Sequence, residues 1–279
     1  MAVDKFLEDS ITACKKVIDN DTITTRNTGK IYRNTNEVLT SILRPQLIEG
    51  KDILSVVASS DQVFTAHYLG AKSVDTFDNN ILAYFYFFLR KWCMFHTGKH
   101  YIPADNKLVM DSLIHHDNSV EEKRAYIFWK EILNYLGKES LYYSELFHKG
   151  SIWWNVPYQN DMNTMINIVQ KLKPNYSRLN IYEPIDIPKQ YDVIILSNIL
   201  EYLYEEPEDY NYYKKMEIII NNLLSLLKPN GIAISSNILD YDYSGNPLFE
   251  KYFEYEEGPS GLNIRFNREV PLSYTYKKK

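Results

Sequence analysis

The chain has 279 residues, a formal net charge of −5 and the composition of a globular protein. The acidic balance argues against a broad basic surface for nucleic acid, although a local basic patch is compatible with it. The two cysteines, Cys14 and Cys93, lie far apart and predict reduced thiols in a cytoplasmic protein, and no metal-ligand spacing occurs. The charged first residues predict no signal peptide, and no apolar run reaches the roughly 20 residues of a transmembrane helix.

The first helix is expected over residues 4–18, where apolar side chains recur at helical spacing. A second helix is expected over 36–47. The polar stretch between them, 22–35, contains Tyr32 and Arg33. A polar loop ahead of the first strand is placed to cover a ligand, so this stretch is a candidate lid.

The first strand and its loop are the most informative feature of the sequence. An apolar run over 53–58 is bounded by the small polar residues Ser59, Ser60 and Asp61, which predicts a buried strand that delivers a tight loop to a helix over 62–69. Such a strand–loop–helix unit is typical of nucleotide-binding α/β domains.

The second strand ends in a carboxylate, Asp78, followed by Asn79. In many nucleotide-binding folds a carboxylate at this place accepts hydrogen bonds from the two hydroxyls of a ribose. The preceding loop reads Ala58-Ser-Ser-Asp61 and lacks the G-x-G-x-x-G fingerprint, whose glycines let the backbone approach a pyrophosphate. A ligand with a pyrophosphate is therefore disfavoured.

The middle of the chain interrupts the alternation of strands and helices. A helix over 81–95 is apolar on almost every side and is expected to be buried. Helices are then predicted over 106–113, 120–136, 140–146 and 161–172, which form a helical insertion. The insertion is rich in aromatic residues and histidines, which either floor a substrate pocket or pack the insertion: Trp129, Tyr142, Tyr143, Trp153, Trp154, Tyr158, His115, His116 and His148.

Alternation resumes in the last third of the chain. A short strand is expected over 178–182, and the continuous apolar run 191–196 is typical of a strand inside a parallel sheet. An amphipathic helix over 210–227 ends at Lys228-Pro-Asn-Gly231, because Pro and Gly do not continue a helix. A strand over 232–236 and an antiparallel pair over 263–266 and 272–276 complete the predicted sheet.

Five landmarks occur in order and resemble the class I S-adenosylmethionine-dependent methyltransferase fold. They are the loop over 53–61, the acidic strand end at Asp78, Asp186 in Glu183-Pro-Ile-Asp186-Ile-Pro, the segment 191–202, and Leu226-Leu-Lys-Pro-Asn-Gly231. The last is similar to the family's Leu-Lys-Pro-Gly-Gly and is the most specific single motif. The resemblance begins at residue 51, breaks off near residue 90, and covers 178 to the C-terminus.

This resemblance implies an α/β, Rossmann-like fold with a mostly parallel sheet, an antiparallel C-terminal strand and a helical insertion. It divides the chain into an N-terminal helical segment (1–50), an S-adenosylmethionine-binding α/β domain (51–96 and 173–279) and the insertion (97–172). The non-glycine loop, the insertion and Tyr32-Arg-Asn-Thr-Asn-Glu37 also resemble, more loosely, the betaine-lipid synthase group. Members of that group transfer the 3-amino-3-carboxypropyl part of S-adenosylmethionine.

The resemblance also implies roles for individual residues on the cofactor side. The loop Ala58, Ser59, Ser60 and Asp61 would bind the amino and carboxyl groups of the methionine part, or would form a plain capping turn. Asp78 and Asn79 would meet the ribose, with a helix N-cap as the alternative role of Asp78. Asp186 would lie near the adenine amino group, or would be an ordinary loop carboxylate. Tyr32 and Arg33 would close over the cofactor carboxylate, where arginine offers a planar fork.

Ser197 and Asn198 end the fourth strand and are expected near cofactor and substrate, since ligands lie outside the carboxyl ends of strands in such sheets. Their alternative role is a polar turn that satisfies helix N-terminal amides. Asn198 and Tyr202 are the candidate catalytic residues, with Tyr202 as a general base or a shelf for the substrate.

The leading hypothesis is a cytoplasmic enzyme that transfers a methyl group from S-adenosylmethionine to a small-molecule or lipid-like acceptor. A sulfonium already activates its carbons, so the lack of a catalytic triad does not count against activity. One alternative is 3-amino-3-carboxypropyl transfer. The other is a non-catalytic binding or regulatory protein, because a fold by itself does not establish activity.

Overall fold

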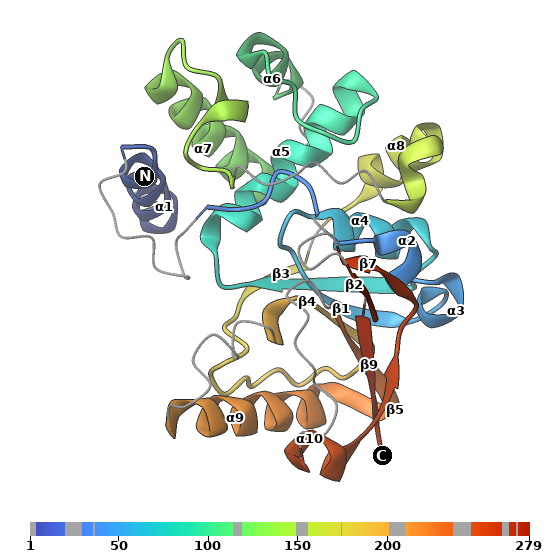
Figure 1. Ribbon diagram of the computed structural model, residues 1–279. Coiled ribbons are helices and arrows are strands. Elements are labelled where there is room, and N and C mark those ends of the chain that lie inside the picture. Colours follow the sequence, from blue (N-terminus) through green and yellow to red (C-terminus); the bar gives the residue numbers. More distant parts are fainter. Residues whose placement is uncertain are drawn as a thin grey trace.

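A computed structural model describes residues 4–19, 30–35, 37–113, 119–148, 156–173, 175–200, 210–236, 247–263, 268–271 and 273–279 (Figure 1). Its strands are β1 Asp52–Val56, β2 Ser73–Asp78, β3 Asn175–Arg178, β4 Tyr191–Ser197, β5 Leu227–Ser236, β6 Phe253–Glu257, β7 Ser260–Asn263, β8 Arg268–Pro271 and β9 Ser273–Lys278. Its α-helices are α1 Lys5–Ile18, α2 Leu39–Ile42, α3 Pro45–Ile48, α4 Asp61–Tyr68, α5 Ile81–Thr97, α6 Asn106–Ser112, α7 Val120–Leu136, α8 Met162–Lys171, α9 Tyr210–Leu226 and α10 Pro247–Tyr252.

One seven-stranded sheet has the order β3-β2-β1-β4-β5-β9-β6, and β7 and β8 form a separate hairpin. Strands β1 to β5 are parallel, whereas β9 runs antiparallel to both β5 and β6. The strand order reverses between β1 and β4, which is the topological switch point where open α/β sheets bind their ligands. The predicted Rossmann-like fold, with a mostly parallel sheet and an antiparallel C-terminal strand, is confirmed.

The sheet separates two hydrophobic cores because successive side chains of a strand point to opposite faces. In β1, Ile53 packs into a core shared with α5, α7 and α8, and Leu54 packs into a second core with α9. In β4, Val193 and Ile194 divide in the same way. Figure 1 shows the helices of the insertion on one side of the sheet, and α9 with α10 on the other. Burial on both faces explains the continuous apolar runs of the central strands.

The insertion packs on α5 and shares its core. The rings of Phe85 and Phe128 stack with centroids 3.8 Å apart, and Trp129 Nε1 donates to the Phe85 carbonyl (2.7 Å). The buried Lys91 Nζ lies 2.5 Å from Glu122 Oε1. These contacts join the predicted segments 51–96 and 97–172 through one continuous core. The proposed division of the chain into domains stays a prediction.

Two predicted helices differ from the observed structure, one near the N-terminus and one in the insertion. The helix expected over 36–47 is two short helices, α2 and α3, because Arg44 precedes Pro45 and takes an extended conformation (φ −101°, ψ 146°). The helix expected over 140–146 is only a 3₁₀ turn, Leu141–Tyr143. Its continuation is extended, since Ile31 N donates to the Leu146 carbonyl (3.1 Å) and forms a bridge with Phe147.

The third strand lies earlier in the chain than predicted. Strand β3 pairs with β2 in a register that sets Asp78 beside Arg178, whereas the sequence indicated a strand over 178–182. Leu179 and Ile181, which suggested that strand, instead pack as a loop against the second core. The predicted strand over 272–276 is observed as β9, which pairs antiparallel with β5 and with β6. Of the other predicted strand, 263–266, residues 264–266 lie outside the described residues.

Gly231 allows β5 to pass close to β4. A Cβ atom at Gly231 would lie 2.9 Å from the Lys228 carbonyl oxygen and 3.1 Å from the Tyr191 carbonyl oxygen. Replacing Gly231 by alanine is therefore expected to lower the free energy of unfolding by about 1–3 kcal/mol, as overpacking does. Urea denaturation followed by circular dichroism measures the change. A change below roughly 0.5 kcal/mol, the usual size of a surface substitution, would contradict this close packing.

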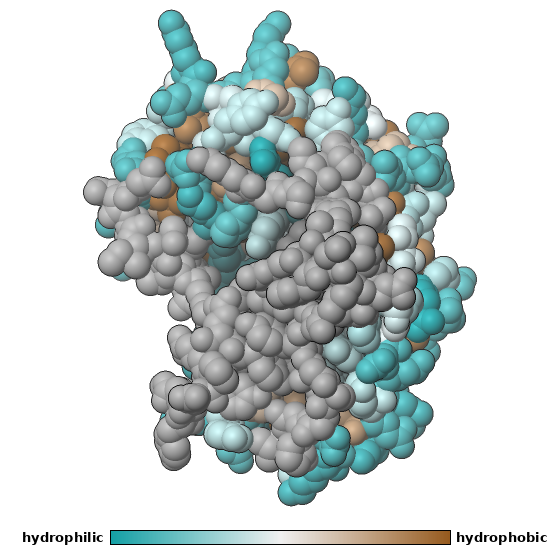
Figure 2. All heavy atoms as spheres, in the orientation of Figure 1, coloured by the Kyte–Doolittle hydropathy of each residue, from teal (hydrophilic) through white to brown (hydrophobic). Residues whose placement is uncertain are grey.

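Within the described residues, no helix is both long and apolar enough to cross a membrane. On the face shown in Figure 2, the described side chains are mainly hydrophilic, and the hydrophobic ones form separate small patches.

Candidate functional site

The backbone at the topological switch point is strained. Three non-glycine residues at the carboxyl ends of β1 and β4 have left-handed backbone angles: Ala58 (φ 44°), Ser60 (φ 74°) and Ser197 (φ 55°). Glycine adopts such angles readily, whereas other residues in sparsely populated regions cost on the order of 1–3 kcal/mol each. Such strain clusters at binding and catalytic sites. The β1 loop therefore adopts left-handed backbone angles with alanine and serine at positions where the family's motif has glycine.

Asp78 ties this loop to the start of α5. Its Oδ2 accepts from Ala58 N (2.9 Å) and its Oδ1 from Asn80 N (2.8 Å). Burial raises the pKa of Asp78 to about 6, although the backbone N–H groups of Asn80, Ala58 and Asn79 lower it. The alternative role as helix N-cap belongs to Asn80, whose side chain accepts from Leu82 N (3.0 Å). A carboxylate has about four acceptor positions, so the Asp78 carboxylate keeps capacity for further donors.

Asp61 is the centre of a buried hydrogen-bond network. Its oxygens accept from Thr35 N (2.6 Å), Ser59 Oγ (2.9 Å), Tyr158 OH (2.7 Å) and Arg90 Nη2 (2.7 Å). Burial by itself raises the pKa of Asp61, but the charge and hydrogen bonds of Arg90 outweigh it, so this pKa lies below its usual value. Both oxygens are occupied within the chain. The predicted contact of Asp61 with a cofactor stays a prediction.

Arg90 joins three distant segments around Asp61. Its guanidinium also donates to the carbonyls of Arg33 (2.9 Å), Ser59 (2.9 Å) and His100 (2.5 Å). Arg90 is only 1% exposed. The N-terminal segment, the β1 loop and the insertion therefore share one buried ion pair.

Tyr32 and Arg33 face the insertion. The Tyr32 ring stacks on His148 with centroids 4.6 Å apart. Arg33 donates from Nη1 to the Tyr142 carbonyl (3.0 Å), and its guanidinium lies 4.2 Å from the centre of the Tyr142 ring. The strap formed by residues 30–35 and Glu37 thus lies between the insertion and the β1 loop. The predicted closure of Tyr32 and Arg33 over a cofactor stays a prediction.

Glu37, at the end of this strap, was not singled out from the sequence. Its carboxylate accepts from Ser197 Oγ at the end of β4 and from Gln62 Nε2 (3.2 Å) in α4. Glu37 is 3% exposed, and Ser235 Oγ donates to the Ser197 carbonyl (3.1 Å) beside it. The strap, α4 and β4 therefore meet in a buried polar cluster at the switch point, which we call the Glu37 cluster.

The remaining predicted site residues are less closely grouped. Asn198 follows Ser197 at the end of β4 and accepts weakly from Ser197 Oγ at 3.4 Å, and Tyr202 lies outside the described residues. Asp186 is exposed and does not follow directly on β3, because that strand ends at Arg178. The residues at the carboxyl end of β3 are Leu179 and its successors. The role of Asp186 at adenine stays a prediction, as do those of Asn198 and Tyr202.

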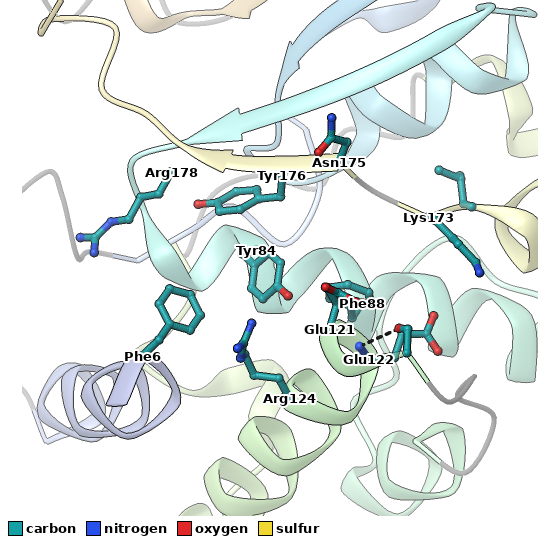
Figure 3. Close-up of a pocket in the computed structure, with 12 residues that line it drawn as sticks. Phe6, Tyr84, Phe88, Glu121, Glu122, Arg124, Lys173, Asn175, Tyr176 and Arg178 are labelled. Carbon is teal, nitrogen blue, oxygen red and sulfur yellow. Dashed lines mark hydrogen bonds between the residues drawn. The ribbon is translucent and has the colours of Figure 1, made fainter. Parts of the chain in front are cut away.

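The aromatic residues of the insertion are mostly packing residues where the structure describes them. Trp129 and Tyr158 are fully buried, whereas Tyr143 is exposed, and His115, His116, Trp153 and Trp154 lie outside the described residues. A cavity of about 370 Å³ lies instead between α1, α5, α7 and β3 (Figure 3), with the rings of Phe6, Tyr84, Phe88 and Tyr176 in its lining. The cavity adjoins β3, the edge strand of the sheet, and its Tyr176 hydroxyl donates to the Asp78 carbonyl (2.9 Å).

No group of three or more His, Cys, Asp or Glu side chains in the described part of the chain is arranged to hold a metal ion.

Comparisons with protein-family models and with curated proteins give no match. Among solved structures, the chain is similar to the N-methyltransferase NodS from Bradyrhizobium japonicum WM9 in complex with S-adenosyl-L-homocysteine (TM-score 0.41, 9% identity, 99% of this chain and 89% of that chain). It is also similar to the rRNA methyltransferase aviRa from Streptomyces viridochromogenes (TM-score 0.41, 8% identity, 100% and 93%). A third match is the ribosomal protein L11 methylase from Lactobacillus delbrueckii subsp. bulgaricus (TM-score 0.32, 12% identity, 87% and 73%). The strand order carries the fold assignment by itself.

Proposed function

We propose that the protein binds S-adenosylmethionine at the carboxyl ends of β1, β2 and β4 and transfers its methyl group to a small-molecule or lipid-like acceptor. The observation that carries the proposal is the meeting of Asp78 with the strained loop Ala58–Ser60 at the switch point of the sheet. The Asp78 carboxylate would accept hydrogen bonds from the ribose hydroxyls, and the adjacent left-handed loop would bind the amino-acid part of the cofactor.

Unsatisfied buried polar atoms near the strap and the β1 loop support a polar ligand there. Ser60 Oγ, Gln62 Oε1 and Asn34 Oδ1 have no hydrogen-bond partner among the residues that the structure describes. Buried polar atoms are nearly always hydrogen-bonded, so several unpaired polar atoms in neighbouring segments suggest that a ligand supplies their missing hydrogen bonds. The amino-acid end of S-adenosylmethionine carries both donors and acceptors and fits this requirement.

The chain's own residues would bind and orient, with little proton transfer needed. Bound S-adenosylmethionine supplies a carbon that its sulfonium already activates. Asp78 would accept from the ribose hydroxyls, and the β1 loop would hold the amino-acid end beside Ser197. Positioning and exclusion of water then account for most of the rate enhancement.

Product analysis tests the reaction. The purified protein is incubated with S-adenosylmethionine and fractions of small metabolites or lipids, and the nucleoside products are quantified by mass spectrometry. Methyl transfer forms S-adenosylhomocysteine in step with a methylated acceptor. Formation of 5′-methylthioadenosine would indicate 3-amino-3-carboxypropyl transfer, and cofactor binding without either product from any fraction would favour a non-catalytic binding protein.

The affinity for S-adenosylhomocysteine is expected to fall as the pH drops below about 6. Burial raises the pKa of Asp78 to about 6. Below this pH the Asp78 carboxylate of the free protein is protonated, and the charged acceptor for the ribose hydroxyls is lost. The same raised pKa makes the Asp78 contribution to folding stability greatest at low pH and lost as the pH rises through about 6. Calorimetric titrations from pH 5 to 8 measure the affinity. A flat profile in the wild type would contradict this role of Asp78.

A further inference from the structure

The Glu37 cluster contains a buried carboxylate that forms no ion pair with any of the described residues. Its described contacts come from the hydroxyl of Ser197 and the amide of Gln62, and Ser236 adds a further side-chain hydrogen bond. None of these donors carries a charge. Burying an ionised carboxylate is costly unless a positive charge accompanies it, and none of the side chains that the structure describes supplies that charge.

The neighbouring Asp61 is a buried carboxylate whose negative charge is balanced by an arginine. Asp61 and Glu37 are both almost fully buried, but Asp61 forms an ion pair with Arg90 at 2.7 Å. The pKa of Asp61 is lowered, whereas burial raises the pKa of Glu37, and the negative charge of Asp61 raises it further. Arg90 is already engaged by Asp61 and by three carbonyls, so it does not supply the positive charge for Glu37.

Two polar atoms, one in the β1 loop and one at the start of α4, have no hydrogen-bond partner among the described residues. Gln62, which donates to Glu37 through Nε2, is 1% exposed, and its own Oε1 has no partner. Ser60 is fully buried, and its Oγ also has no partner. The Glu37 carboxylate and the Gln62 carbonyl oxygen belong to side chains in direct contact and offer acceptors, and Ser60 lies two positions before Gln62 in the chain. An ammonium group, with three donors and one positive charge, satisfies such acceptors.

We infer that Glu37, with Gln62 and Ser197, binds the α-ammonium group of the amino-acid part of S-adenosylmethionine. The inference rests on the proposed function and deepens it, since it assigns one end of the cofactor to the strap. Thr35 N donates to Asp61 and Glu37 N donates to Thr35 Oγ1 (3.1 Å), so the strap holds the carboxylate at the switch point. The charge of the amino-acid end then determines affinity, and a nucleoside without it binds weakly.

Enclosure of the amino-acid end has a consequence for the reaction. If the strap at Glu37 holds the amino-acid end of S-adenosylmethionine, the acceptor cannot reach it. This shielding favours transfer of the methyl group over transfer of the 3-amino-3-carboxypropyl group. The cluster is therefore a determinant of cofactor specificity and of which carbon faces the acceptor.

Calorimetric titration with two ligands tests the inference. S-adenosylhomocysteine carries the amino-acid end, whereas 5′-methylthioadenosine lacks it. In the wild type we expect S-adenosylhomocysteine to bind more tightly. Glu37→Gln keeps the size of the side chain but removes its charge, so we expect it to weaken S-adenosylhomocysteine about 10- to 100-fold and to leave 5′-methylthioadenosine unchanged.

Glu122→Gln is the matched control, because Glu122 is equally buried but pairs with Lys91 beside α5. It should leave the ratio of the two affinities unchanged. Equal weakening of both ligands by Glu37→Gln would assign Glu37 a structural role and overturn the inference, as would no weakening at all. Absence of binding of either ligand to the wild type would overturn the proposed function itself.

A second measurement needs no variant. The wild type is titrated with the analogue of S-adenosylhomocysteine that lacks only the amino group. We expect it to bind about 10- to 100-fold more weakly than S-adenosylhomocysteine, since the charge-assisted hydrogen bonds are lost. Equal affinity of the two compounds would show that no ammonium site exists and would overturn the inference even where Glu37→Gln does not fold.

Discussion

Replacing Arg90 by methionine is expected to lower the free energy of unfolding by about 3–5 kcal/mol, the usual loss when one partner of a buried ion pair is removed. Arg90 is 1% exposed and pairs with Asp61 at 2.7 Å. Without it the Asp61 carboxylate stays buried without a cation, and the carbonyls of Arg33, Ser59 and His100 each lose a donor. Urea denaturation followed by circular dichroism gives the free energy.

Arg124→Met is the control for this experiment. Arg124 also pairs with an aspartate, Asp4, at 2.6 Å, but both side chains are partly exposed. Its replacement should lower stability by less than about 1 kcal/mol, as for other surface pairs. Adding Asp61→Asn to Arg90→Met should recover part of the loss, because the double variant has no unpaired charge. An Arg90→Met variant as stable as Arg124→Met would contradict the central place of the ion pair.

Replacing Asp78 by asparagine is expected to weaken binding of S-adenosylhomocysteine about 100-fold. The change removes the charge and one acceptor oxygen, and hydrogen bonds to charged groups contribute about 1.5–3 kcal/mol each, where 1.4 kcal/mol is tenfold in affinity. The fold should persist, although Ala58 N or Asn80 N loses its acceptor. Isothermal titration calorimetry at pH 7.5 measures the affinity, and circular dichroism verifies the fold.

Asp75→Asn makes the same chemical change on the same strand, away from the switch point. Asp75 pairs with Lys189 at 2.8 Å and accepts from Tyr191 OH (2.9 Å). Its replacement should leave the affinity for S-adenosylhomocysteine unchanged. If both variants bind like the wild type, the assignment of the ribose to Asp78 is wrong.

The central strands were predictable from the sequence because both faces of the sheet are buried. The apolar runs of β1 and β4 contrast with polar residues at their ends. Pro229 and Gly231 indicate the end of α9, but they lie within β5, which begins at Leu227 and not at residue 232 as expected. Strand β3 was misplaced because it is an edge strand of polar residues, Asn175–Arg178, and pairs with one neighbour only. Its pattern gives little signal, while the apolar loop that follows imitates a strand.

The candidate site was only partly predictable. The position of the loop Ala58–Asp61 and of the end of β4 at the switch point was predictable, because the order of the strand ends follows from the chain order. Glu37 was missed because its role depends on Ser197, which lies 160 positions away, and on burial that no local pattern encodes. The hydrogen bonds of Asp61 with Arg90 and Tyr158 were not predictable, since nothing in the sequence indicates that these side chains surround it.

The most direct test of the proposed function is an isothermal titration of the wild-type protein with S-adenosylhomocysteine. This ligand needs no acceptor and carries both the ribose and the amino-acid end. We predict one site per chain with a dissociation constant in the micromolar range, which corresponds to a binding free energy on the order of −8 kcal/mol. No detectable heat with S-adenosylhomocysteine, and none with S-adenosylmethionine, would contradict a cofactor site at the carboxyl ends of β1, β2 and β4.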